Sequence, residues 1–208
     1  TGVQTCALPI LDNASAAVQS LNASDVIEQT LTYRITDADG DSSPASVTIK
    51  IVGADDAAKV TVSAEGADST VYEAGLNPNG SAAAGNSETD SDSFQVSASD
   101  GIKSVVVGGE TFTLAQLKDA AYLAANTINT GEGTLTLTGY SGDAGDMSAT
   151  ITYSYTLDSA QTHTQPGNDT TLSDSVVVTV NGVGGSSDTA NLTIDIIDDV
   201  PKATADGT

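Results

Sequence analysis

Two stretches of the chain repeat one another without a gap, and this repeat constrains the fold more than any other feature. Residues 31–52 read LTYRITDADGDSSPASVTIKIV, and residues 176–197 read VVVTVNGVGGSSDTANLTIDII. Val47 aligns with Leu192, so the offset is 192 − 47 = 145 residues, and six of the 22 aligned pairs are identical. The alternation of apolar residues stays in phase on both sides of the central loop. A fixed long period indicates a tandem array of similar units.

The period also defines the units that we expect. An Asp-Asp pair follows each copy, at Asp55-Asp56 and at Asp198-Asp199. We expect three segments in order: the C-terminal part of a preceding unit (residues 11–56), one complete unit (57–199), and the start of the next unit or a linker (200–208). A unit of this length can bury enough surface to fold by itself.

The charge of the chain limits its partners. The chain has 28 acidic and 6 basic residues among 208, which gives a formal net charge of −22. Nucleic acids and anionic membranes are bound through clustered lysine and arginine side chains, so both are excluded as partners. The excess of carboxylates favours binding of cations, or solubility alone. The sequence has no run of 18 apolar residues, so we expect no membrane-spanning segment.

The only cysteine does not help to define the fold. Cys6 lies within residues 1–10 (TGVQTCALPI), which resemble the translation of a common sequencing-adapter oligonucleotide. We therefore expect this segment not to be native. Without disulfides, the fold must be stabilised by packing or by a bound metal ion.

Alternation of apolar and polar residues with a period of two predicts strands along most of the chain. In residues 150–157 (TITYSYTL), for example, we expect Ile151, Tyr153, Tyr155 and Leu157 to share one face. The predicted strands are Thr30–Thr36, Ser46–Val52, Lys59–Ala64, Ser93–Ala98, Ile102–Val107, Glu110–Thr113, Gly133–Tyr140, Thr150–Leu157, Asp174–Asn181 and Ala190–Ile197. Short strands joined by turns are typical of an all-β sandwich of two sheets.

Two kinds of segment depart from this pattern. Leu114–Ala125 has good helix formers and apolar residues at helical spacing, which predicts one short helix per unit at the end of the sandwich. Residues 77–92 and 161–171 are rich in small and polar residues and are predicted to be loops.

Residues 37–41 (DADGD) give the strongest chemical signal in the sequence. Alternating carboxylates around a glycine let the backbone turn tightly while several oxygens converge, and Ca²⁺ prefers about six to eight oxygen ligands. The spacing is not that of an EF-hand, because Ser46 stands where the glutamate is needed. We predict a calcium site at Asp37, Asp39 and Asp41, with an ordinary Asp/Gly hairpin turn as the alternative.

The corresponding loop of the second copy, residues 181–188 (NGVGGSSD), has lost these aspartates but keeps the glycine turn. It cannot offer the same ligands. Either only some units bind calcium at this loop, or Asp188 and other carboxylates substitute.

Paired carboxylates at the unit junctions form a second candidate metal site. Asp55-Asp56 and Asp198-Asp199 lie where one unit ends and the next begins, and Glu73 lies in the VYEAGL segment. A cation that bridged them would remove their mutual repulsion and stiffen the junction. The alternative is that they are solvated linker residues without a metal.

The sequence has no evident catalytic constellation. The only histidine, His163, lies in a polar segment, where we expect it to be exposed and without a role. Without a second histidine or a native cysteine there is no zinc site of the usual kind, and no Cys–His or Ser–His–Asp arrangement has support. We therefore expect no enzymatic activity.

Six motifs stand in order along the chain: DADGD (37–41), VYEAGL (71–76), TLAQL (113–117), GTLTLTGY (133–140), ITYSYTL (151–157) and IDDVP (197–201). Together with the repeat, they resemble the long tandem repeat of giant type I-secreted RTX adhesins of bacteria. The resemblance covers nearly all of the chain from about residue 22 onward. It implies Ig-like antiparallel β-sandwich units strung into an extracellular stalk.

The resemblance also implies site residues and a location. Its metal ligands fall on residues already named: the loop Asp37, Asp39, Asp41 and the junction pairs Asp55-Asp56 and Asp198-Asp199. It implies export through a type I system to the bacterial cell surface, and a role there in cell adhesion and biofilm formation.

We therefore expect a non-enzymatic, calcium-stabilised spacer whose partners are calcium and neighbouring repeats of the same chain. A surface or glycan ligand is expected to bind through other regions of the whole protein. The alternative is a carbohydrate- or protein-binding β-sandwich module, in which one sheet face or the loop at residues 77–92 holds the ligand. Few aromatic residues are available to stack on sugars, with six Tyr, two Phe and no Trp.

Overall fold

The computed structural model describes residues 10–12, 15–19, 21, 23–54, 57–61, 68–163 and 172–199. Predictions for other residues, among them the junction pair Asp55-Asp56 and the segments 1–9 and 200–208, lie outside the described residues. Of the helices in the described part of the chain, none has the length and apolar character needed to cross a membrane.

Strands make up most of the described elements, and the longest helix has six residues. In chain order the elements are α1 (Ala16–Gln19), β1 (Val26–Thr36), β2 (Ser42–Val52), β3 (Ala58–Thr61), β4 (Ser69–Tyr72), the 3₁₀ helix η1 (Glu73–Gly75), β5 (Thr89–Ala98), β6 (Ile102–Val107), β7 (Glu110–Thr113), α2 (Leu114–Leu117), α3 (Ala120–Ala125), β8 (Ile128–Asn129), β9 (Gly133–Gly142), β10 (Ser148–Leu157), β11 (Leu172–Gly182) and β12 (Ser187–Ile197). The all-β class is as predicted.

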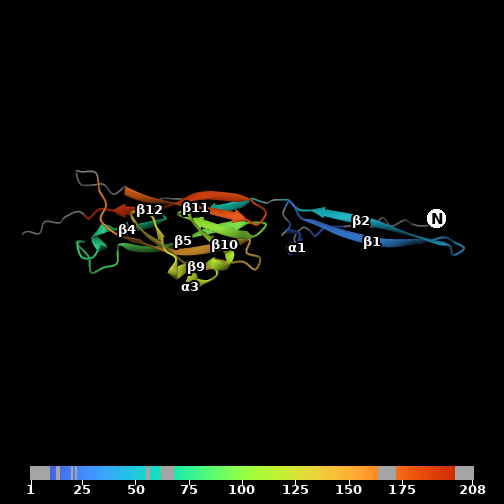
Figure 1. Ribbon diagram of the computed structural model, residues 1–208, viewed down its shortest axis with the longest axis horizontal. Helices are drawn as coiled ribbons and strands as arrows, with labels where there is room; N and C mark the ends of the chain where they lie inside the picture. Colours follow the sequence, from blue (N-terminus) through green and yellow to red (C-terminus); the bar gives the residue numbers. More distant parts are fainter. Residues whose placement is uncertain are drawn as a thin grey trace, which may run out of the picture.

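Ten of the strands form two five-stranded sheets that enclose a common core (Figure 1). The strand orders are β3-β5-β10-β9-β8 and β4-β12-β11-β6-β7. Neighbours are antiparallel, except that β4 and β12 are parallel. Strands β3-β5-β10-β9 follow the A-B-E-D order of an immunoglobulin sheet, and β6-β11-β12 follow the C-F-G order of its partner. This topology confirms the predicted Ig-like sandwich.

The core is built from alternate residues of the facing strands. On β10, Ile151, Tyr153, Tyr155 and Leu157 are each no more than 2% exposed, as the alternation predicts. Because the chain has no tryptophan, Tyr153 and Tyr155 are the largest fully buried side chains. Aliphatic residues from both sheets pack around them.

The two buried tyrosines also join the sheets through hydrogen bonds. Tyr155 donates its hydroxyl to Asp174 Oδ2 at 2.8 Å, and the Tyr153 hydroxyl lies 2.9 Å from Ser69 Oγ. Burial raises the pKa of both phenols, so both hydroxyls stay protonated. Asp174 is on β11 and Ser69 on β4, in the opposite sheet, so each bond spans the core. A buried phenol needs such a partner.

The predicted strands are all present in the structure. Strands β6 and β7 have the predicted bounds. Strand β3 begins one residue before its predicted start and ends at Thr61, and the rest of its predicted range lies outside the described residues. The other predicted strands extend past their predicted ends by up to four residues. The predicted loop at residues 77–92 is wrong in its last part, because Thr89–Asp92 belong to β5 and pair with β10. These four residues are polar, and backbone pairing rather than side-chain pattern places them in the sheet.

Strands β4 and β8 are not visible in the sequence pattern. Strand β8 has two residues, which is too short for any alternation. Strand β4 is held by its neighbours: it pairs in parallel with β12, and Thr70 N donates to Asp90 Oδ2 at 3.0 Å. Its position depends on contacts that are distant in the sequence.

The helical segment lies at the predicted residues but is divided into two helices, and α3 packs against β9 along the side of the sandwich and not across its end (Figure 1). Lys118 and Asp119 separate α2 from α3. The Asp119 carboxylate accepts hydrogen bonds from Ala121 N and Tyr122 N at 3.0 and 3.1 Å, and so caps α3. Aspartate is a strong N-cap residue, and it begins a new helix here instead of continuing the first.

Strands β1 and β2 form a separate two-stranded sheet beyond one end of the sandwich, along the long axis of the molecule (Figure 1). Thr36 pairs with Ser42 at the tip of this hairpin. The residues 145 positions later, Asn181 and Ser187, pair in the same way at the tip of β11–β12. The rest of the two ladders has the same register. The repeat in the sequence is therefore also a repeat in the structure.

The two hairpins differ in what covers them. On β11, Val176 and Val180 are 3% and 0% exposed, whereas their counterparts Leu31 and Ile35 on β1 are 47% and 64% exposed. Within the described residues, no second sheet faces β1–β2. A lone two-stranded hairpin is marginally stable in water, so β1–β2 has the form of a sandwich edge without its core.

Replacing Tyr155 with Phe tests the hydrogen bond across the core. The substitution leaves the buried Asp174 carboxylate without its donor, so we expect the free energy of unfolding to fall by about 1–3 kcal/mol. Tyr33→Phe is the matched control, because Tyr33 is exposed on the hairpin, and it should change stability by less than about 0.5 kcal/mol. Equal effects of the two substitutions in denaturant unfolding would contradict this role.

Candidate metal sites

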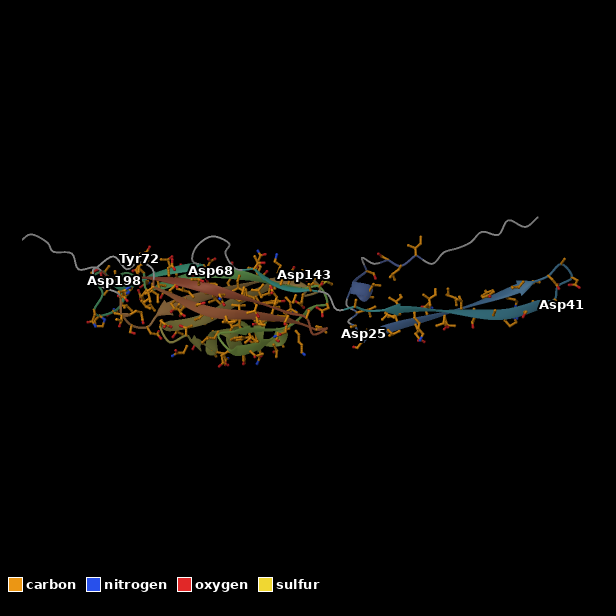
Figure 2. The ribbon with its side chains drawn as sticks, turned by 90° about the horizontal axis from the view of Figure 1, so that it is seen from above. Asp25, Asp41, Asp68, Tyr72, Asp143 and Asp198 are labelled. Carbon is orange, nitrogen blue, oxygen red and sulfur yellow. The ribbon has the colours of Figure 1, made fainter. Side chains whose placement is uncertain are left out.

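The candidate ligands lie at three places along the molecule. Figure 2 shows Asp198 beside Tyr72 at one end of the sandwich, Asp143 at the opposite end, and Asp41 at the tip of the hairpin. We call the end with Asp198 the distal end. The other is the proximal end, which holds Asp143 and the β11–β12 turn at residues 182–186.

The DADGD loop connects β1 to β2 and brings its three carboxylates together. One oxygen from each of Asp37, Asp39 and Asp41 lies within 4.8 Å of the other two, and all three residues are exposed. Asp41 N donates to Asp37 Oδ1 at 2.8 Å, and Gly40 has a φ of +100°, which favours glycine. The donors are all hard oxygens, which fits a calcium ion whose remaining ligands are carbonyls or water.

Hydrogen bonding explains part of this loop without a metal. The pKa of Asp37 is held below its ordinary value, first by its hydrogen bond with the Asp39 side chain and then by nearby backbone N–H groups. The bond from Asp41 N is what an Asp/Gly turn needs. This hydrogen bond does not explain why the carboxylates of Asp39 and Asp41 also lie close to that of Asp37. The geometry is therefore compatible with both an Asp/Gly turn and a calcium site.

A second Asp/Gly turn, between β9 and β10, offers a comparison. Asp143 Oδ1 accepts hydrogen bonds from Gly145 N and Met147 N at 3.1 and 2.9 Å. Its neighbour Asp146 forms an ion pair with Lys118 at 2.6 Å. In the described part of the chain, no Lys or Arg is paired with the three aspartates of the DADGD loop. Unlike the β9–β10 turn, that loop therefore has no lysine beside any of its carboxylates.

The β11–β12 turn places a different carboxylate at the equivalent position. Gly185 has a φ of +99°, like Gly40. Asp100, from the β5–β6 connection, is 4% exposed and accepts a hydrogen bond from Gly184 N. A Cβ at Gly182 would lie 2.6 Å from Asp100 Oδ1 and 2.4 Å from Ser186 Oγ. The glycine that replaces Asp37 in this copy thus makes room for Asp100.

Asp188, the other residue considered as a substitute ligand, has a structural partner. Its Oδ2 accepts a hydrogen bond from Val60 N at 2.8 Å. This bond fixes the start of the sandwich, at β3, to the beginning of β12. Among the described residues, no group of three carboxylates converges at the β11–β12 turn as it does in the DADGD loop.

The distal end brings together two of the predicted junction ligands and one residue that was not predicted. Glu73 begins η1, Asp198 follows β12, and His163 lies in the β10–β11 connection. One ligand atom from each lies within 4.8 Å of the other two. His163 Nε2 is 2.9 Å from Glu73 Oε1, which also accepts a hydrogen bond from Gln161 N at 2.6 Å.

The prediction that His163 is an exposed bystander is wrong. Its side chain is 3% exposed and that of Glu73 is 5% exposed. The two residues are 90 positions apart, so no local signal could have indicated their contact. The residues around His163 are polar because the loop is at the surface, but they do not indicate that the imidazole itself points inward.

Asp199, the other junction residue that the structure describes, is not part of this cluster. Asp199 Oδ2 and Oδ1 accept hydrogen bonds from Ser81 N at 2.7 Å and from Ser81 Oγ at 2.5 Å. This pair anchors the loop after η1 to the end of β12. Asp55 and Asp56 lie outside the described residues, so their predicted role is not tested.

Comparisons with known proteins add little to this picture. No protein-family model matches the chain, and no curated protein matches it. Seven chains of solved structures match. One is the crystal structure of the protocadherin GammaB4 extracellular domain, with 13% identity and a TM-score of 0.34, covering 81% of this chain and 20% of that one. The present chain thus spans a fifth of that chain's length, and a likeness this weak carries no argument about function.

Introducing the missing aspartate at the second turn tests the role of Asp100. We expect Gly182→Asp to lower the free energy of unfolding by about 1–3 kcal/mol, because its Cβ would overlap Asp100 and Ser186. In an Asp100→Ala background the additional loss should be smaller, since one of the two clashes is relieved. Denaturant unfolding of the two single variants and the double variant measures this coupling, and strict additivity would contradict the assignment.

Proposed function

We propose that this chain is part of a non-enzymatic spacer in a secreted adhesin of the bacterial cell surface, built from tandem Ig-like units and stabilised by calcium. The observation that carries the proposal is the hairpin β1–β2. Its strands have 11 residues each, as do β11 and β12, and both hairpins share one register. The hairpin exposes the face that its counterpart buries, which is expected of the closing hairpin of a preceding unit.

In such an array the distal end of one unit meets the proximal end of the next. The pair Asp198-Asp199 leaves the distal end of the described sandwich. Asp100 lies at the proximal end of the described sandwich, and the repeat in the sequence gives the preceding unit a matching pair, Asp55-Asp56. Acidic residues are therefore concentrated at the contacts between units, and neighbouring repeats are the principal partners of each unit.

In this proposal the stiffness of the junctions between units depends on the calcium concentration. Where calcium is scarce, as in a bacterial cytosol, the carboxylates repel one another and the array stays loose and suited to export. Outside the cell, millimolar calcium would fill sites with dissociation constants of about 10⁻⁴–10⁻³ M. At that concentration the ratio of ion to dissociation constant is about 1–10, which adds about 0.4–1.4 kcal/mol of stability per site. Weaker sites gain less.

Replacing Asp39 with Ala tests the calcium loop. Loss of one of three converging carboxylates should weaken calcium binding to the full chain about tenfold or more. Asp143→Ala is the matched control, because it removes an aspartate from an Asp/Gly turn in which the other aspartate is paired with Lys118 and three carboxylates do not converge. Isothermal titration calorimetry with CaCl₂ measures both, and calcium binding that is unchanged in Asp39→Ala would overturn the assignment of this loop.

A polar groove on the outer face of the first sheet supports the alternative of a ligand-binding module. It is open to solvent and lies between β3 and the β9–β10 turn, lined by residues such as Lys59, Gln95, Ser141 and Thr150. None of the described residues that line it is aromatic, so it has no stacking platform for a sugar ring. A glycan array probed with the full chain separates the two functions, because a spacer should bind no glycan.

A further inference from the structure

The cluster at the distal end contains an imidazole nitrogen, a ligand that a calcium site of carboxylates does not use. Glu73, His163 and Asp198 supply one imidazole nitrogen and two carboxylate oxygens, all within 4.8 Å of one another. They come from three segments that are far apart in the sequence. Figure 2 shows Asp198 at the very end of the sandwich, next to Tyr72, the residue before Glu73.

We propose that Glu73, His163 and Asp198 bind a divalent transition-metal ion such as Zn²⁺. Imidazole nitrogen suits zinc and similar ions, whereas calcium takes oxygen ligands. Zinc is commonly held by three protein ligands, with water or another group in a fourth position. The inference is independent of the proposed spacer function, because it rests on the geometry of one sandwich.

Burial strengthens the case for a cation at this place. The Glu73 side chain is 5% exposed and lies against the buried His163, with the Asp198 carboxylate in reach. The buried Glu73 carboxylate has lost hydration, and the half-buried Asp198 carboxylate beside it adds a second negative charge, so the pair favours a compensating positive charge. A divalent ion supplies it, and its binding to His163 requires that Nε2 carry no proton.

The rival explanation is a purely structural hydrogen bond. His163 Nε2 and Glu73 Oε1 are 2.9 Å apart, which is a good hydrogen-bond length. Such a bond would fix the β10–β11 connection over η1. It gives no role to Asp198, whose carboxylate also faces this pair. A metal ion would link all three segments, including the end of β12, from which the chain leaves the sandwich.

The single histidine makes the proposal directly measurable. Because the chain contains only one, its imidazole NMR resonances report on His163 alone. The experiment uses the full chain with Cys6→Ser, so that the thiol cannot bind the ion. We expect ZnCl₂ to shift these resonances at about one ion per chain and CaCl₂ to leave them unchanged. Zinc binding without a shift of the His163 resonances would overturn the proposal, as would an equal shift with calcium.

His163→Gln separates the metal site from the hydrogen bond. Glutamine can still donate to Glu73 but lacks the imidazole ligand. We expect its zinc affinity to fall at least tenfold while its melting temperature in EDTA stays near that of the parent. Asp39→Ala, the control at the distant loop, should bind zinc like the parent. Unchanged zinc affinity in His163→Gln would overturn the assignment.

A second variant guards against a failure of His163→Gln to fold. Asp198→Asn keeps the contact between His163 and Glu73 and removes one ligand charge. It should also weaken zinc binding and reduce the rise in melting temperature that zinc causes in the parent. A zinc-induced rise equal to that of the parent would contradict a site made of these three residues.

Discussion

Burial of one face of the β11–β12 hairpin against the opposite sheet is the interaction on which the rest of the structure depends. Residues such as Val178 and Ile194 on that face are fully buried, and each aliphatic side chain of this kind contributes about 1.5–3 kcal/mol when removed from water. The β1–β2 hairpin has the same register and turn but exposes the equivalent face. Contacts between the two strands, in the backbone and between facing side chains, therefore build the hairpin, and the facing sheet makes it part of a domain.

The carboxylates of this acidic chain serve two different purposes. Asp174 and Asp100 are buried acceptors of hydrogen bonds from Tyr155 and Gly184, and Asp188 accepts one from Val60. These residues position strands and turns. The clusters in the DADGD loop and at the distal end instead bring ligand atoms of like-charged residues together, which gives each cluster a reason to bind a cation. Net charge alone does not distinguish the two uses.

Much of the fold could be predicted from the sequence, because period-two alternation is a local signal. It located every long strand, and the repeat at 145 residues predicted the matching hairpins. Strand β4 could not be predicted, since its parallel pairing with β12 and its bond to Asp90 are long-range contacts. The same limit applies to the site. The acidity of residues 37–41 is visible locally, whereas the approach of His163 to Glu73 depends on how two distant loops fold over one another.

Amide hydrogen exchange on the full chain tests most directly whether a hairpin of this repeat needs a facing sheet to be stable. The account predicts that amides of β11 and β12 exchange only on global unfolding, while those of β1 and β2, in the same register, exchange through openings of far lower free energy. Equal protection of the two hairpins in the chain alone would contradict it, because the β1–β2 hairpin would then be stable without a facing sheet.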